Sequence, residues 1–169
     1  MIDHSDLLLT LTQIAMALLG FTGVVIALKH ETKVWAPLEE IGFQALITTT
    51  LTALIASLLP SIFSIVVEEE QAIWRLSNLG IGILHFANLL AIIIKTSKSK
   101  IIQQSDRKAS IKDIVDLILG PVLIVSHFIA ARGWIPWADL LLVIGIIQQL
   151  YIGMGNFLRL VKSAPNTAK

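Results

Sequence analysis

Two histidines stand inside long apolar stretches of this sequence, where a polar side chain costs free energy unless it finds a partner. His85 falls near the middle of an apolar run over residues 72–94, and His127 lies towards the end of another over residues 114–131. An imidazole in such a place can carry a proton, bind a metal ion or cofactor, or stay neutral and bond a neighbour. The sequence leaves all three roles open for His85 and favours the structural role for His127.

Polar and small residues recur along one face of each apolar run, at the spacing of three, four and seven that a helix brings together. The polar members are candidate residues of a pore or polar interior: Gln13, Thr50, Ser57, Ser61, Asn78, His85, Asn88, His127, Gln149 and Asn156. The glycines on these faces are candidate sites of close helix packing: Gly20, Gly23, Gly82 and Gly153. Such faces either pack helices together or line a hydrated path.

Enzyme motifs are missing from the sequence. It contains no HExxH, GxSxG, P-loop or GxGxxG pattern. Asp and Glu do not occur in the middle of any apolar run, and the absence of cysteine excludes disulfides, thiolate catalysis and thiolate metal sites. We therefore predict that the protein is not an enzyme and has no catalytic residues, no metal site and no cofactor.

The composition predicts an integral membrane protein. Hydrophobic residues make up 55% of the 169 residues and charged residues 15%, against roughly 25% charged in a typical soluble domain. The mean hydropathy is +0.79. A soluble domain this short could not bury so much apolar surface, whereas lipid removes the need to do so. The net charge of +1 is too balanced to favour nucleic-acid binding.

Five apolar runs approach or exceed the length of about 20 helical residues that crosses a bilayer. They cover approximately residues 7–28, 41–67, 72–94, 114–131 and 138–161. Backbone groups inside lipid must be bonded within their own segment, so each run is predicted to be a helix. The expected fold is all-α, a single transmembrane domain over residues 1–169 with about five spanning helices.

The distribution of positive charge predicts the orientation. With five spans, one side of the membrane receives Arg75 and Arg132 only, and the other receives the remaining 11 of the 13 Lys and Arg residues. The positive-inside rule then places the N-terminus outside and the C-terminus in the cytoplasm. Tryptophans fall near the predicted boundaries, as interfacial aromatic residues do: Trp35, Trp74, Trp134 and Trp137.

The segment Lys95–Lys112 is the longest predicted loop, and it carries six positive charges against the single Asp106. We expect it to attract anionic lipid headgroups, and a docking site for a partner protein is the alternative. Five short helices enclose little interior of their own, and stripes of small residues often serve contacts between protomers. We therefore expect a homo-oligomer.

Short sequence patterns in the first half of the chain resemble those of known membrane proteins. GFTGVVIAL occupies Gly20–Leu28 and is followed by a basic loop with Trp35, SLLPS occupies Ser57–Ser61, and Trp74-Arg75 opens the third run. This pattern resembles small, uncharacterised bacterial multi-span membrane proteins over about half of the chain. The resemblance implies a bacterial cytoplasmic (inner) membrane, but no activity and no functional residues.

Two functions fit these features. The first is a homo-oligomeric channel or transport protein whose polar helix faces line a path across the membrane. The alternative is a non-catalytic accessory or scaffold subunit, in which the same faces are helix-packing contacts. The sequence narrowly favours the first.

Overall fold

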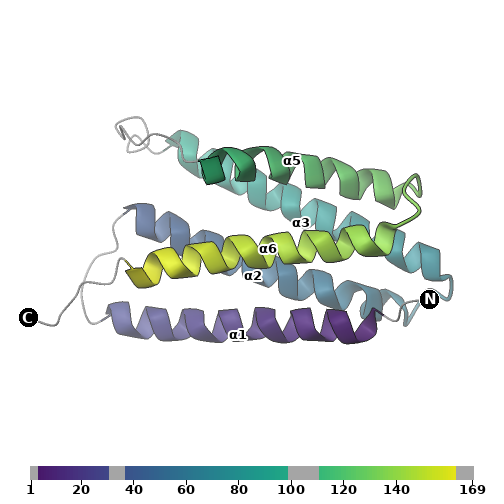
Figure 1. The fold of residues 1–169 in the computed structure, drawn as a ribbon, viewed down its shortest axis with the longest axis horizontal. Coiled ribbons are helices and arrows are strands. Elements are labelled where there is room, and N and C mark those ends of the chain that lie inside the picture. The colour runs from purple at the N-terminus through teal and green to yellow at the C-terminus, as the bar shows by residue number, and fades with distance from the viewer. Residues whose placement is uncertain (1–3, 31–36, 99–110, 163–169) are drawn as a thin grey trace, which may run out of the picture. The chain divides into compact units, whose positions relative to one another are not determined.

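The computed structural model describes residues 4–30, 37–98 and 111–162, and these form five helices with no strand (Figure 1). The helices are α1 (Ser5–His30), α2 (Pro37–Phe63), α3 (Glu70–Lys98), α5 (Ile111–Ala131) and α6 (Ala138–Lys162). The predicted all-helical class is therefore confirmed.

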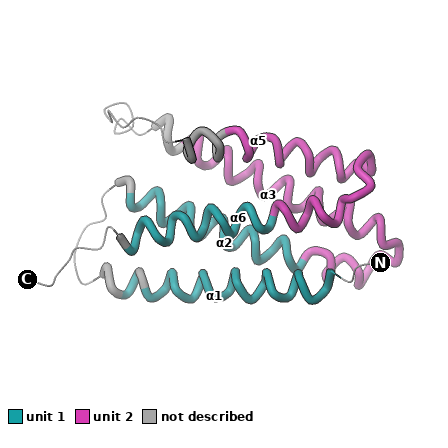
Figure 2. The backbone as a smooth tube through the Cα atoms, in the orientation of Figure 1, with its two compact units in different colours: residues 1–58, 146–169 teal, residues 59–145 magenta. Residues whose placement is uncertain are grey.

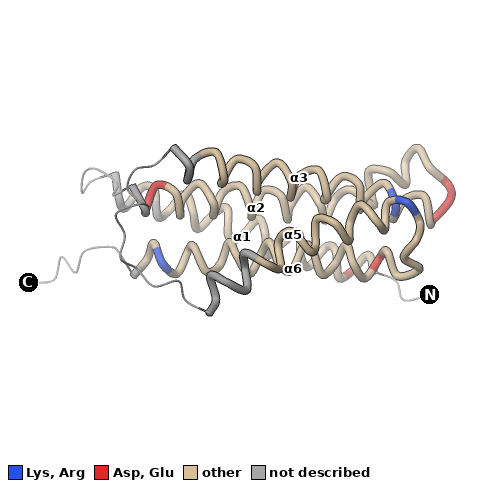
Figure 3. The backbone as a smooth tube through the Cα atoms, turned by 90° about the horizontal axis from the view of Figure 1, so that it is seen from above, with Lys and Arg blue, Asp and Glu red and all other residues tan. Residues whose placement is uncertain are grey.

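Four of these helices are long and apolar enough to cross a membrane. The apolar stretches are Ser5–Val24 in α1, Glu39–Phe63 in α2, Glu70–Ile94 in α3 and Ala138–Val161 in α6. The fifth helix, α5, is apolar over the shorter stretch Ile118–Ala131. Figure 3 shows that Lys, Arg, Asp and Glu lie near the ends of the described helices, which leaves their middles uncharged.

Backbone hydrogen bonds fix where two of the helices end. The α5 helix ends at Ala131 and is capped at Gly133, whose φ of 78° suits a residue without a side chain. The Gly133 N–H donates to the Ala130 carbonyl at 2.9 Å, and the Trp134 N–H donates to the Ile129 carbonyl at 3.4 Å. These two bonds form a Schellman cap, which turns the chain into α6.

The α2 helix ends at Phe63, whereas the apolar run continues to Val67. Residues 64–66 form tight turns, in which the Ile65 N–H donates to the Ile62 carbonyl at 3.3 Å and the Val66 N–H donates to the Phe63 carbonyl at 3.1 Å. The residues of this turn are as apolar as those of the helix, so the hydropathy of the sequence could not show where the helix ends.

The chain forms two compact units, coloured separately in Figure 2. Unit 1 comprises residues 1–58 and 146–169, and unit 2 comprises residues 59–145. Unit 1 therefore contains α1, most of α2 and the second part of α6. Unit 2 contains the end of α2, all of α3 and α5, and the start of α6.

Unit 1 is held together by an apolar cluster and a buried hydroxyl pair. Leu46 and Leu160 are buried with Phe43 and Phe157 packed against them. The ring of Phe157 also lies 6.2 Å, centroid to centroid, from that of Phe21 in α1. A second link between α1 and α2 is the 2.7 Å hydrogen bond between the hydroxyls of Thr12 and Ser57.

Gly153 allows α6 to approach α2 closely within unit 1. A Cβ added at Gly153 would lie 2.8 Å from Oγ1 of Thr50 and 3.3 Å from Oγ1 of Thr49. Both hydroxyls are buried, and each donates to a carbonyl of its own helix at 2.7 Å. They cannot move aside without breaking a bond that is already made. Gly20 is different, because a Cβ there would meet no described atom within 4 Å.

We expect Gly153→Ala to lower the stability of the protein by about 1–3 kcal/mol, the usual cost of overpacking a close contact. Thermal unfolding in detergent, followed by circular dichroism, measures this change. Gly20→Ala is the matched control, because no described atom of the same chain lies within 4 Å of the added methyl group. Alanine favours the helix, so this variant should be as stable as the wild type or up to about 1 kcal/mol more stable. Equal unfolding temperatures for the two variants would show that Gly153 is not a packing residue.

Unit 2 is built on the packing of α3 against α5. Its buried core consists of Leu123, Ala130, Ala138 and Leu141, with Trp74 and Ile135 packed against it. Gly80 lies close to the side chain of Leu59, since a Cβ at Gly80 would stand 2.6 Å from Cδ1 of that leucine.

Candidate functional site

A buried polar cluster lies in unit 2, and Asn78 is at its centre. The Nδ2 atom of Asn78 donates to the carbonyl of Trp74 at 2.9 Å and to the carbonyl of Ala138 at 2.7 Å. Its Oδ1 atom lies 2.8 Å from Nδ1 of His127. The side chain of Asn78 thus joins α3 to the start of α6 and to α5, and it is completely buried.

These bonds determine which nitrogen of His127 carries the hydrogen atom. Two carbonyls accept from Asn78, so the atom that faces them is the amide nitrogen and the atom that faces His127 is the amide oxygen. An amide oxygen only accepts, so Nδ1 of His127 must be the donor. In a neutral imidazole the other nitrogen, Nε2, then carries a lone pair and is a hydrogen-bond acceptor.

His85 is the second imidazole of the cluster. It lies on α3 seven positions after Asn78, and its ring meets that of His127 edge-on, with centroids 5.2 Å apart and an interplanar angle of 62°. His85 is 4% exposed and His127 0% exposed. Within the described part of the chain, Nε2 of His85 and Nε2 of His127 are both buried without a hydrogen-bond partner, as is Oγ of Ser77.

Unpartnered buried polar atoms are unfavourable and uncommon. Each costs about 1–3 kcal/mol relative to a bonded one, and most buried side-chain polar atoms in proteins do have a partner. Two such nitrogen atoms belong to imidazole rings that lie against each other in this cluster. They make this cluster the strongest candidate for a functional site.

Two glycines bring the backbone close to the ring of His127. A Cβ at Gly82 in α3 would lie 3.2 Å from Cβ of His127, and a Cβ at Gly145 in α6 would lie 2.5 Å from its Nε2 atom. Any side chain larger than hydrogen at position 145 would therefore press on the acceptor nitrogen. Gly82 was a predicted packing residue, whereas the sequence gave no reason to pair Gly145 with His127.

Of the residues predicted from the sequence, the structure brings together Asn78, Gly82, His85 and His127. Asn88, further along α3, is half-buried, and Ser61 near the end of α2 is exposed. The carbonyl of Ala138 and Gly145 belong to the site but were not among the predicted site residues.

The remaining predicted residues lie in unit 1, and most of them bond within their own helix. Thr50 donates to the Leu46 carbonyl, Ser57 donates to the Leu54 carbonyl at 2.9 Å, and Asn156 donates to the Ile152 carbonyl at 3.0 Å. Gln149 is buried and donates to the side chain of Gln148 at 3.1 Å, while its own Oε1 atom has no described partner.

The face of α1 that was predicted to be polar and packed is exposed in the structure. Gln13, Gly20 and Gly23 are all exposed, and no described atom comes within 4 Å of a Cβ placed at either glycine. The buried face of α1 carries Leu8, Leu11, Thr12, Ala15, Leu18 and Thr22 instead. Contact of the glycine face with another protomer stays a prediction.

Comparison with known proteins found no matching protein-family model, no matching curated protein and no matching solved structure. In the described ranges, no three His, Cys, Asp or Glu side chains gather in a way that could hold a metal ion. Two imidazoles and one amide can form hydrogen bonds, and the imidazoles can also take up and release protons.

Proposed function

We propose that this protein is a small membrane transport protein, in which protons move through a polar interior that includes Asn78, His85 and His127. One observation carries the proposal. Two imidazoles on α3 and α5 lie in contact, each with a buried Nε2 atom that has no partner, inside helices whose composition suits lipid. Ionisable groups in such positions often belong to ion or proton paths.

The arrangement of the cluster suits proton transfer. Asn78 holds the hydrogen atom of His127 on Nδ1, and this leaves Nε2 of His127 ready to accept a proton. The ring then carries a positive charge until Nε2 gives the proton up again. His85, with its ring centroid 5.2 Å away, is the next group that can take the proton, directly or through a water molecule.

Proton movement by the purified protein in sealed lipid vesicles tests this function. A potassium gradient with valinomycin supplies the driving voltage, and a trapped pH-sensitive dye reports acidification. Vesicles that contain the protein should acidify faster than vesicles without it. Equal rates at every voltage would reject proton transport.

A second function, that of an accessory or scaffold subunit, is favoured by the structure of unit 1. There the hydroxyls of Thr50 and Ser57 bond to carbonyls of their own helix, and Gly153 serves close packing. These polar residues need no water or ion to be satisfied. If the whole protein is a scaffold, the vesicles show no proton movement and the histidines contribute to stability alone.

We further propose five membrane spans in a homo-oligomer of the bacterial inner membrane, with the N-terminus outside and the C-terminus in the cytoplasm. The charge distribution supports this orientation. A Glu69→Cys variant should then react in intact cells with a thiol reagent that cannot cross the membrane. The side chains of the Lys95–Lys112 segment, proposed to attract anionic lipid, lie outside the described residues.

A further inference from the structure

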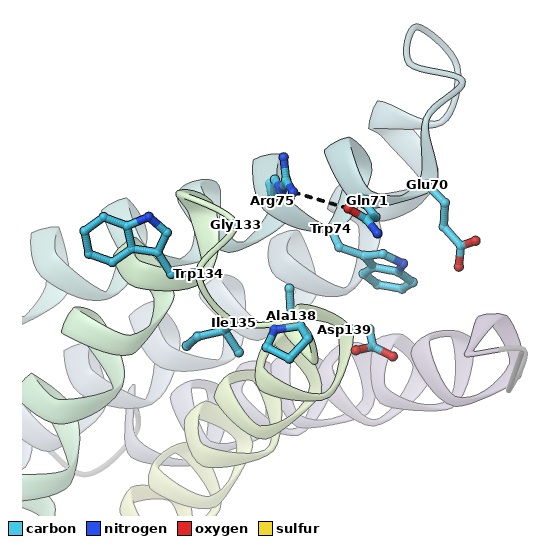
Figure 4. A pocket seen from close by; sticks show the side chains of 10 residues that line it. Glu70, Gln71, Trp74, Arg75, Gly133, Trp134, Ile135, Ala138 and Asp139 are labelled. Atoms are coloured by element: carbon cyan, nitrogen blue, oxygen red, sulfur yellow. Dashed lines mark hydrogen bonds between the residues drawn. The ribbon is translucent and has the colours of Figure 1, made fainter.

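Unit 2 contains a pocket of about 550 Å³ where α3 begins and the chain turns from α5 into α6 (Figure 4). This volume falls within the usual range for sites that bind small molecules. The apolar stretches of α3 and α6 both begin here. The pocket therefore lies at the boundary between membrane and water, where lipid headgroups are present at high concentration.

Acidic, basic and aromatic side chains are among those that line the pocket. Glu70 and Asp139 supply carboxylates, Arg75 supplies a guanidinium group, and Trp74 and Trp134 supply indole rings. Figure 4 shows the carboxylates of Glu70 and Asp139 on the side of Trp74 that faces away from Arg75. Negative and positive groups are thus separated across one aromatic ring.

The position of Arg75 depends on the turn that follows α5. A Cβ at Gly133 would stand 2.6 Å from Cζ of Arg75, so the guanidinium group lies against a residue that has no side chain. Arg75 donates to Oε1 of Gln71 at 3.2 Å, a neutral acceptor. A guanidinium group has five N–H donors, which suits it to bind a phosphate through two parallel bonds.

We propose that this pocket binds the phosphoethanolamine headgroup of a membrane lipid. Arg75 binds the phosphate. The primary ammonium group lies by the ring of Trp74, where it gains cation–π attraction and donates to the carboxylates of Glu70 and Asp139. Choline has no N–H to donate, and a glycerol headgroup has no positive charge, so lipids that carry those headgroups bind less well. This proposal does not depend on proton transport.

Native mass spectrometry of the full-length protein in detergent tests the proposal. Phosphatidylethanolamine is added in competition with phosphatidylcholine and phosphatidylglycerol of the same acyl chains. We expect it to be retained in preference to both. Arg75→Gln should weaken its binding about tenfold, the loss expected for one charge-assisted contact. Glu70→Gln combined with Asp139→Asn should remove the preference over phosphatidylcholine.

Matched control variants are available at the same end of unit 2. Arg132 lies over the ring of Trp134, 5.9 Å from its centroid, and does not line the pocket, so Arg132→Gln should bind as the wild type does. Glu68 does not line the pocket, so Glu68→Gln is the control for Glu70→Gln and should leave the lipid preference unchanged. Arg75→Lys keeps the positive charge and should retain part of the lipid binding. Partial binding by this variant would show that Arg75→Gln loses affinity because the phosphate contact is lost and not because the protein is unfolded.

Three results would overturn the proposal. Equal retention of the three lipids by the wild type would show that only the acyl chains are bound. Unchanged retention in Arg75→Gln would show that the headgroup lies elsewhere. Soluble glycerophosphoethanolamine should compete poorly, because it lacks acyl chains; competition as strong as that of the lipid would reject the lipid as the ligand.

Discussion

Replacing Asn78 with leucine should destabilise this protein by roughly 3–5 kcal/mol, the sum expected when several buried hydrogen bonds are lost and their partners stay buried. The side chain of Asn78 makes three such bonds, to the carbonyls of Trp74 and Ala138 and to Nδ1 of His127. Leucine fills a similar volume, so the loss comes from the missing bonds and not from a cavity. Nδ1 of His127 would be left without its acceptor.

Thermal unfolding in detergent measures this effect, and Ser126→Ala is the control. Ser126 is next to His127 in sequence, but its hydroxyl donates only to the Val122 carbonyl of its own helix, at 2.9 Å. Its removal should change stability by less than about 1 kcal/mol. If Asn78→Leu unfolds at the same temperature as Ser126→Ala, the bonds of Asn78 do not hold α3, α5 and α6 together.

His85→Leu should stop proton movement in vesicles while leaving the protein as stable as the wild type, or more stable. Nε2 of His85 is buried without a partner, and replacing such a ring with an apolar side chain removes an unfavourable atom. A residue that serves packing would show the opposite result. We expect proton flux to fall at least tenfold, because leucine cannot take up a proton.

His127→Leu should lose both flux and stability, since His127 also bonds to Asn78. Comparison of the two variants therefore distinguishes His85, which is proposed only to carry protons, from His127, which is proposed to carry protons and also to stabilise the fold. His4→Ala is the control, because His4 precedes α1 and lies outside the cluster. A His85→Leu variant that conducts protons as the wild type does would remove His85 from the path.

Helical spacing places three residues of the candidate site on one face of one helix. Asn78, Gly82 and His85 are separated by four and three positions, and such positions must share a face of any helix. The structure indeed has all three buried in unit 2. Spacing within one helix carries no information about its neighbour, however. The bond between Asn78 and His127, and the approach of Gly145 to the same ring, depend on how three helices pack.

The α1 helix shows why the polarity of a stripe does not decide which face is buried. Gln13, Gly20 and Gly23 form a regular stripe, but they are exposed. The buried stripe contains Thr12 and Thr22, and the Thr22 hydroxyl donates to the carbonyl of Leu18 in its own helix. A threonine that bonds its own helix is nearly apolar towards a neighbouring helix. In lipid, moreover, an exposed apolar face costs nothing, so hydropathy cannot choose between the two faces.

A proton path through this protein requires that water reach the buried pair of histidines, and cysteine labelling tests this most directly because the chain has no cysteine of its own. A His85→Cys variant in vesicles should react with a small water-soluble thiol reagent. Glu69→Cys, in the turn before α3, should react readily and serves as the positive control. Ile83→Cys, on the exposed apolar face of the same helix, should be protected by lipid. If His85→Cys is as fully protected as Ile83→Cys, the cluster is dry and the protein is not a proton path.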